Sequence, residues 1–259
     1  MQRIFSIIHE AGTAILNEYQ SCGVGIEYKK DGSPVTAADK RSGDLISAQL
    51  LRYFPDIPVL SEEAVTIPYE ERKNWKQFWL VDPLDGTKEF IKKTGEFTVN
   101  IAFIDNGCPV IGFIHAPVLN LTYIAFNGKS NRLNGNSLDD PEILSGRKVN
   151  RKNITVVASR DHAGPQVKSL LKRLQDATTR NIGSSLKFCL VAEGTADLYY
   201  RDGTTMEWDT AAGQAIVEAA GGAVLTESGV PLRYNKESLQ NPSFVTIGDK
   251  SINWKKLIG

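Results

Sequence analysis

The strongest chemical signal in the sequence is a set of carboxylates placed at the ends of predicted elements. In WLVDPLDGTKEF, residues 79–90, Asp82 and Asp85 follow the apolar run FWLV. A carboxylate at the end of a buried strand costs desolvation free energy unless it meets a cation, caps the next element or faces water. Other acidic residues follow short apolar runs or stand in the first turns of predicted helices: Asp39, Glu62, Glu63 and Asp209.

These carboxylates suit a site for hard divalent cations. Mg²⁺ takes oxygen ligands, usually carboxylates with phosphate oxygens and water, so side chains that converge from several strand ends suit phosphate chemistry. In the predicted turn, Pro83 fixes the backbone and Leu84 can offer its carbonyl oxygen. Gly86 permits close approach, and Thr87 opens a short predicted helix whose N–H groups can receive a phosphate. Taken singly, each aspartate could equally be a helix cap or a solvated residue.

Length and composition predict a globular protein with no integral membrane segment. The 259 residues are 41% hydrophobic and 23% charged, and no apolar run approaches the roughly 18 residues of a membrane span. Thirty basic and thirty acidic residues argue against nucleic acid polymers as partners. No secretory signal is expected, and the cysteines lack metal-type spacing, which favours reduced thiols in the cytoplasm: Cys22, Cys108 and Cys189. Loose membrane association and the choice between monomer and homodimer stay open.

The apolar patterns predict helices and strands that alternate along the chain. Helical patterns cover the N-terminus and residues 36–53, 167–174, 184–193 and 209–220. Strand patterns cover residues 58–60, 78–81, 97–104, 110–116, 121–126, 154–159, 197–200 and 223–225, with a hairpin at Asp105-Asn106-Gly107. We therefore expect a layered α/β sandwich with mixed sheets, formed by one domain, 1–259. A polar loop at 128–151 would join a metal-binding half, 1–150, to a substrate-binding half, 151–259.

Two motifs far apart in the chain resemble the signature of a known enzyme family. DPLDGT at 82–87 and WDTAAG at 208–213 are similar to the paired motifs of the lithium-sensitive, magnesium-dependent phosphatases. That superfamily includes inositol monophosphatases, fructose-1,6-bisphosphatases and 3'(2'),5'-bisphosphate nucleotidases. The likeness extends through SPVTAAD, PVLSEE, GEFTVNIA and GSSLKFCLVAEG, and the last two look like the bacterial bisphosphate nucleotidases associated with sulfur assimilation.

The resemblance implies an α-β-α-β-α sandwich and a metal-dependent hydrolase. The expected reaction removes the 3'-phosphate of 3'-phosphoadenosine 5'-phosphate (PAP) to give AMP, with the sulfated analogue PAPS as a further substrate. Five residues would hold two to three Mg²⁺ ions: Glu62, Asp82, Leu84 through its carbonyl, Asp85 and Asp209. Asp82 would bridge two ions, and Glu62 would also reach a weaker third. Asp39 and Thr87 would orient and deprotonate the attacking water, and Li⁺ would inhibit.

The resemblance also implies the substrate contacts. Beside the metals, the substrate would meet Glu62, Leu84, Asp85, Gly86, Thr87 and Asp209. Ser184 and Lys187 would bind the phosphate that remains after hydrolysis, because amides at a helix start and a nearby lysine favour an anion. Ser159, Arg160 and His162 would line the adenosine side. Lys187 could instead be a surface lysine and His162 an ordinary surface histidine.

Glu207 departs from the expected pattern, because the nucleotidases should carry an uncharged residue directly before Trp208. An acidic residue there could favour a sugar hydroxyl or face solvent. An inositol monophosphatase-like or broad sugar phosphatase therefore stays open as an alternative, and Lys187 is the residue that separates the two, since a monophosphate needs no second anion site. A non-catalytic nucleotide-binding relative is the remote alternative, and the complete acidic set counts against it.

Overall fold

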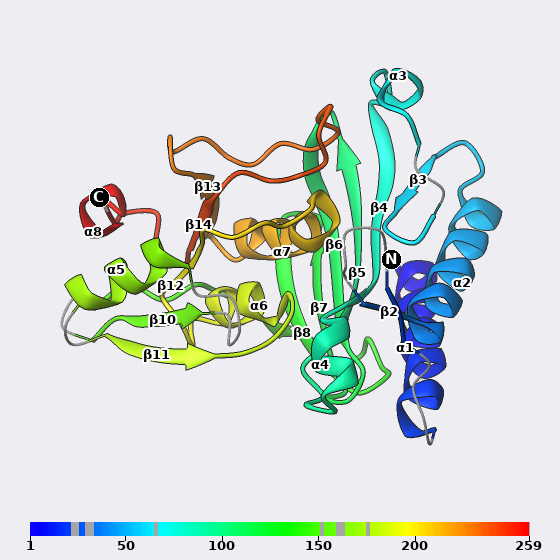
Figure 1. The fold of residues 1–259 in the computed structure, drawn as a ribbon, viewed down its shortest axis with the longest axis horizontal. Coiled ribbons are helices and arrows are strands. Elements are labelled where there is room, and N and C mark those ends of the chain that lie inside the picture. Colours follow the sequence, from blue (N-terminus) through cyan, green and yellow to red (C-terminus); the bar gives the residue numbers. More distant parts are fainter. Residues whose placement is uncertain are drawn as a thin grey trace.

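The protein is built in layers around two β-sheets, with helices on both outer faces and between the sheets (Figure 1). The structure is a computed structural model that describes residues 1–21, 26–28, 34–64, 67–150, 153–158, 164–174 and 177–258. Helices α1 and α2 cover one sheet, α6 and α7 lie between the sheets, and α5 and α8 lie on the far side (Figure 1). This α-β-α-β-α order is the predicted one.

The first sheet has seven strands in the order β3-β4-β5-β6-β7-β8-β9, all antiparallel except the β3–β4 pair. A separate two-stranded sheet pairs β1 with β2. The elements of this part of the chain are α1 (Gln2–Gln20), β1 (Ile26–Tyr28), β2 (Pro34–Thr36), α2 (Ala37–Tyr53), β3 (Val59–Ser61), α3 (Tyr69–Arg72), β4 (Gln77–Asp85), α4 (Thr87–Ile91), β5 (Thr98–Asp105), β6 (Cys108–Ala116), β7 (Leu121–Phe126), β8 (Lys129–Asn134) and β9 (Glu142–Ile143).

The second sheet has five strands in the order β11-β10-β12-β14-β13. Strand β10 pairs in parallel with β11 and β12, whereas β14 is antiparallel to β12 and β13. The elements are β10 (Thr155–Ala158), α5 (Pro165–Arg173), β11 (Thr178–Asn181), α6 (Leu186–Ala192), β12 (Leu198–Arg201), α7 (Glu207–Ala219), β13 (Ala223–Thr226), β14 (Phe244–Ile247) and α8 (Lys255–Ile258). Mixed sheets with helices on both faces confirm the predicted fold class.

Strand β4 corrects the expectation that Asp82 and Asp85 lie in a turn after a strand that ends at Val81. Both aspartates belong to β4, and their pairing with β5 shifts register between Asp82 and Asp85. Such a shift re-aims side chains near a strand end without ending the pairing. Trp79 and Val81 face α1 and α2, while Phe78 and Leu80 face the middle layer, so the strand is buried on both faces.

The polar segment 128–151 is likewise only partly a loop. Lys129–Asn134 forms β8 and pairs with β7, and β9 adds a short edge to the same sheet. Asn127 and Gly128 both have positive φ, and they connect Phe126 to Lys129 in a two-residue hairpin of the kind also formed by Asn106 and Gly107. The hairpin predicted at 105–107 is confirmed. A second hairpin lies within the segment that was expected to be a loop joining the two halves of the chain.

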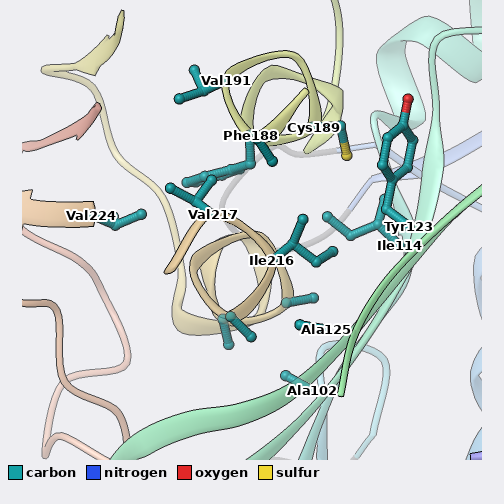
Figure 2. Close-up of a cluster of buried hydrophobic side chains, with 14 of the residues drawn as sticks. Ala102, Ile114, Tyr123, Ala125, Phe188, Cys189, Val191, Ile216, Val217 and Val224 are labelled. Atoms are coloured by element: carbon teal, nitrogen blue, oxygen red, sulfur yellow. The ribbon is translucent and has the colours of Figure 1, made fainter. Parts of the chain in front are cut away.

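Helix α7 carries a predicted metal ligand, and close packing fixes its position against the first sheet. A Cβ atom on Gly112 of β6 would lie 2.5 Å from the backbone oxygen of Ala212, so only glycine permits this approach. Figure 2 shows Ile216 of α7 directed toward the first sheet, and Val217 between Phe188 and Val224. The buried cluster around α7 therefore joins residues on both sides of position 150.

Two histidines, the buried His115 and the half-buried His9, meet where α1 packs on the first sheet. The Thr122 hydroxyl lies 3.0 Å from Nε2 of His9 and 2.9 Å from Nδ1 of His115. The two imidazole rings are in contact, with centroids 4.2 Å apart. Burial lowers the pKa of His9 and lowers the pKa of His115 to about 3, so both rings are neutral in the folded protein at pH 7.

We expect the stability difference between the wild type and a His115→Gln variant to shrink as the pH falls. The folded pKa of His115 is depressed below its unfolded value, so the unfolded chain binds a proton that the folded chain does not. The wild type should therefore lose up to about 1.4 kcal/mol per pH unit from about pH 6.5 downward, a loss that the variant lacks at this position. Urea unfolding of both proteins across that range measures the difference, and a constant difference would contradict the assignment.

Candidate active site

A polar cleft lies where the end of β4, the starts of α4, α6 and α7 and the end of β12 meet. Its volume is about 280 Å³. Seven of the residues predicted from the sequence line it: Glu62, Asp82, Leu84, Asp85, Gly86, Thr87 and Asp209. Ser184 and Lys187 line the same cleft, so residues from both ends of the predicted site come together.

Three carboxylates converge at the floor of this cleft. One carboxylate oxygen from each of Glu62, Asp82 and Asp209 lies within 4.8 Å of the other two. Glu62 directly follows β3, whose parallel pairing with β4 places it beside Asp82, and Asp209 comes from the first turn of α7. The capping role considered for the aspartates is also present, because Asp209 accepts a hydrogen bond from the Met206 N–H at 2.9 Å. Asp209 thus caps α7 and also belongs to the carboxylate cluster.

The carboxylate cluster holds more negative charge than its surroundings compensate. Burial, followed by the charges of Glu62, Asp85 and Asp209, raises the pKa of Asp82 well above its usual range. Burial and the charges of Asp85 and Glu62 likewise raise the pKa of Asp209. Hard carboxylate oxygens that repel one another fit a divalent cation such as Mg²⁺, which would relieve the repulsion.

Asp85 lies near both the three-carboxylate cluster and Lys187. Burial raises the pKa of Asp85, while the charge of Lys187, the Ser185 N–H and the Asn100 side chain lower it. The backbone of Leu84 is tied into the same turn, since its N–H donates to Asp82 at 3.0 Å and its carbonyl lies 3.4 Å from the Thr87 hydroxyl. Asp85 therefore interacts with both the acidic floor and a basic residue of the cleft.

Asp39 and Thr87, the predicted catalytic pair, are in direct contact. The Thr87 hydroxyl donates to Oδ1 of Asp39 at 3.0 Å, and Oδ2 of Asp39 accepts from the N–H of Thr36 at 2.7 Å. The bond from Thr36 belongs to the capping box at the start of α2, in which Asp39 is the third helical residue. Burial raises the pKa of Asp39 despite the opposing hydrogen bonds, so its environment favours uptake of a proton.

Two basic residues, Lys187 and Arg201, line the same cleft, and Lys187 is buried. Lys187 is 7% exposed, and its ammonium donates to the Ser184 carbonyl at 2.5 Å, which excludes a surface role. Ser184 adopts a positive φ of 49°, and its buried hydroxyl has no hydrogen-bond partner in the part of the chain that the structure describes. Gly86, with φ 93°, lies against Ser184, since a Cβ on Gly86 would come 3.2 Å from the Ser184 Cβ. Gly86, next to Asp85, and Ser184, whose carbonyl accepts from Lys187, are therefore in direct contact.

Arg201 is a cleft residue that sequence reasoning missed. It ends β12, lines the cleft as Tyr199 does, and donates to the Thr204 carbonyl at 3.0 Å. Its buried Nε has no hydrogen-bond partner among the described residues. Its charge is close enough to Lys187 to lower the pKa of that lysine, although burial is the larger cause. The signal in the sequence was a basic residue directly after the strand pattern at 197–200.

Glu207 corrects another expectation, since it neither faces solvent nor lines the cleft. Its side chain is fully buried and accepts hydrogen bonds from the backbone N–H groups of Asn235 and Lys236, at 2.7 and 3.0 Å. The Lys236 ammonium adds an ion pair at 2.6 Å. Glu207 therefore anchors a distant loop to α7.

Three predicted adenosine contacts lie outside the described residues: Ser159, Arg160 and His162.

Comparison with known proteins identifies the family. The sequence pattern described as "Inositol monophosphatase family" matches residues 3–253. The chain belongs to this family. Among its relatives, the 3'(2'),5'-bisphosphate nucleotidase CysQ of Escherichia coli K12 is 46% identical over 94% of this chain and 98% of its own length. The protein of that name from Haemophilus influenzae is 37% identical over 99% and 96% of the two chains.

Solved structures of the inositol monophosphatase family share this fold. The crystal structure of CysQ from Bacteroides thetaiotaomicron has a TM-score of 0.83 and 40% identity, with 95% of each chain covered. An inositol monophosphatase from Thermotoga maritima has a TM-score of 0.74 and 24% identity, with 96% and 92% covered. Within the described part of the chain, no helix is long and apolar enough to span a membrane.

Proposed function

We propose that this protein is a magnesium-dependent 3'(2'),5'-bisphosphate nucleotidase that hydrolyses the 3'-phosphate of PAP to give AMP, and that it also accepts PAPS. The observation that carries the proposal is a single cleft lined both by the carboxylates of Glu62, Asp82, Asp85 and Asp209 and by two basic residues, Lys187 and Arg201. A substrate with two phosphates matches both sets of residues. Relatives at 37 to 46% identity over nearly the whole chain are named as nucleotidases of this type.

We assign the metal-holding role to the acidic floor of the cleft. Two to three Mg²⁺ ions would be held by Glu62, Asp82, the Leu84 carbonyl, Asp85 and Asp209, with Asp82 shared between ions. When bound, the ions would lower the pKa of the attacking water and neutralise charge on the reacting phosphate. This donor set consists only of hard oxygens, which is the chemistry that Mg²⁺ prefers.

The remaining steps fall to residues around the acidic floor. Asp39 would accept a proton from the attacking water through or beside Thr87, whose hydroxyl is 3.0 Å from Oδ1 of Asp39. The backbone N–H groups of Gly86 and Thr87 would orient the phosphate, because they open α4 at the edge of the cleft. Positioning and charge stabilisation carry most of the catalysis in phosphoryl transfer.

The basic residues of the cleft support a nucleotide bisphosphate over a monophosphate. Burying an ammonium is costly unless it is compensated, and Lys187 is 7% exposed beside the partnerless hydroxyl of Ser184. A phosphate there would give the Lys187 ammonium an anionic partner, and it would bond to the Ser184 hydroxyl and the Arg201 Nε, which lack partners among the described residues. An inositol monophosphate brings no second phosphate to these residues. We propose further that the enzyme acts on this small-molecule nucleotide in the cytoplasm.

Phosphate release is the direct test of the proposed function. The purified protein should release phosphate from PAP in the presence of Mg²⁺, and EDTA should stop the reaction. Inositol 1-phosphate and fructose 1,6-bisphosphate serve as competing substrates at the same concentration. Preference for inositol 1-phosphate would reassign the enzyme to the monophosphatases, and Mg²⁺ binding without hydrolysis of any substrate would leave the non-catalytic alternative.

We expect Li⁺ to inhibit PAP hydrolysis at millimolar concentration or below. Li⁺ has a radius close to that of Mg²⁺ but half its charge, so it can occupy a carboxylate site without giving equal stabilisation to the leaving oxygen. Initial rates at fixed Mg²⁺ should fall as LiCl is added, while the same concentration of KCl has little effect. Equal rates in the two salts would remove lithium sensitivity from the assignment.

A further inference from the structure

A chain of buried polar side chains runs beneath the cleft from β5 to the start of α6. The Ser185 hydroxyl donates to Oδ1 of Asn100 at 2.8 Å and lies 2.8 Å from the Thr98 hydroxyl. All three side chains are almost completely buried, with exposed fractions of 0% for Thr98, 1% for Asn100 and 2% for Ser185. A buried polar group in this setting is costly unless its hydrogen bonds are satisfied.

The hydrogen bonds in this chain have one direction. Because Ser185 uses its proton on Asn100, its oxygen accepts from the hydroxyl of Thr98, its other hydrogen-bond partner among the described residues. The bond to Oδ1 also fixes the orientation of the Asn100 amide, so its NH₂ group lies on the other side. That nitrogen is buried and has no hydrogen-bond partner among the residues that the structure describes. The chain therefore ends in an unused donor.

The unused donor lies beside the Asp85 carboxyl. Asp85 interacts with the Asn100 side chain and also with the backbone N–H of Ser185. Strand pairing explains this proximity, because β5 places Thr98 opposite Asp85 and Asn100 opposite Asp82 across the register shift. The Asn100 side chain and the Ser185 N–H therefore lie close to a carboxyl that also lines the cleft.

We propose that Asn100 is a positioning residue that orients Asp85 for Mg²⁺ and, through Ser185, links the metal end of the cleft to the loop that holds the second phosphate. The proposal rests on the proposed function for the identity of the metal and the nucleotide. The linkage is short, since Ser185 follows Ser184 directly and Lys187 donates to the Ser184 carbonyl at 2.5 Å. Binding at either end should therefore favour binding at the other.

The main variant is Asn100→Leu, which keeps a similar side-chain shape and removes both polar atoms. Loss of a hydrogen-bond partner of a metal ligand typically weakens metal binding by about ten- to a hundredfold. We expect a rise of that size in the Mg²⁺ dissociation constant from calorimetry without nucleotide, and in the Mg²⁺ concentration for half-maximal PAP hydrolysis. At saturating Mg²⁺ the kcat should return to within about threefold of wild type, since the chemical groups remain.

A second variant, Ser185→Ala, tests the linkage from the other end. It also provides an independent test if Asn100→Leu does not fold. It should also weaken Mg²⁺ binding, and the double variant should be no weaker than Asn100→Leu alone, because both changes break the same chain. In the wild type, AMP should tighten Mg²⁺ binding, and each variant should reduce that effect. Thr246→Val is the matched control, since Thr246 is fully buried with a partnerless hydroxyl in β14 and should leave Mg²⁺ binding unchanged.

Two results would overturn the positioning role. One is unchanged Mg²⁺ affinity in both variants while their thermal stability falls, which would mark a purely structural chain. The other is a loss of kcat that saturating Mg²⁺ does not restore, with additive effects in the double variant. The proposed function is judged separately, because the wild type either hydrolyses PAP with Mg²⁺ or does not, whatever the variants do.

Discussion

Replacing Asp82 with asparagine should reduce Mg²⁺-dependent hydrolysis of PAP by about a thousandfold or more while making the metal-free protein more stable to heat. Asp82 is 1% exposed and stands at the centre of the acidic floor, in the three-carboxylate cluster with Glu62 and Asp209. The substitution keeps the volume of the side chain and removes its charge. A bound metal contributes several kcal/mol to phosphoryl transfer, and each 1.36 kcal/mol corresponds to a factor of ten.

The expected gain in stability follows from the sign of the pKa shift. Burial and the charges of Glu62, Asp85 and Asp209 raise the pKa of Asp82 in the folded state. A raised carboxyl pKa means that the ionised form destabilises the folded protein at pH above the unfolded pKa, which includes pH 7. Asparagine removes this cost, so the melting temperature of the variant in EDTA should exceed that of the wild type.

Differential scanning calorimetry with and without Mg²⁺ separates the two effects. Mg²⁺ should raise the melting temperature of the wild type and have a much smaller effect on Asp82→Asn. Asp44→Asn on the exposed face of α2 is the matched control and should change neither activity nor the Mg²⁺ response. Near-normal turnover in Asp82→Asn at ordinary Mg²⁺ would remove Asp82 from the mechanism.

Local sequence patterns predicted much of the fold because their causes are local. Thr36 and Asp39 form the capping box that starts α2, and Asn106-Gly107 supplies the two positive φ angles of a tight hairpin. Strand β8 was missed although Asn127-Gly128 gives the same hairpin signal. The reason is that KSNRLN alternates weakly, with only Ser130 and Leu133 buried, so pairing with β7 decides its structure.

The acidic site was predictable from residue types and motifs, whereas its supporting residues were not. Carboxylates at element ends and the likeness of DPLDGT and WDTAAG led to Asp82, Asp85 and Asp209. Glu207 was misjudged because its partners, Asn235 and Lys236, lie 28 and 29 residues away in the chain. Asn100 gave no signal, because an asparagine in an apolar strand pattern reveals its role only once Ser185 is beside it. Contacts between residues far apart in the chain produce no regular residue spacing that can be detected in the sequence.

The second large effect is expected at Lys187, where replacement by methionine should lower kcat/KM for PAP by about ten- to a hundredfold. A hydrogen bond between charged partners contributes roughly 1.5 to 3 kcal/mol, and methionine keeps the buried volume without the charge. The loss should fall mainly on KM, since the role proposed for Lys187 is to bind the phosphate that is not transferred. Hydrolysis of a simple monophosphate at saturating Mg²⁺ should change less than threefold, because that substrate makes no use of the anchor.

This comparison of substrates distinguishes an anchor from a catalytic or structural residue, whose loss would lower both reactions alike. Saturating Mg²⁺ is necessary because the charge of Lys187 also lowers the pKa of Asp85, so its removal can weaken metal binding indirectly. Lys92→Met, at an exposed lysine after α4, is the control for loss of one positive charge near the site. Equal losses for PAP and the monophosphate would refute the anchor role, and the choice of a nucleotide bisphosphate would then rest on family relationship alone.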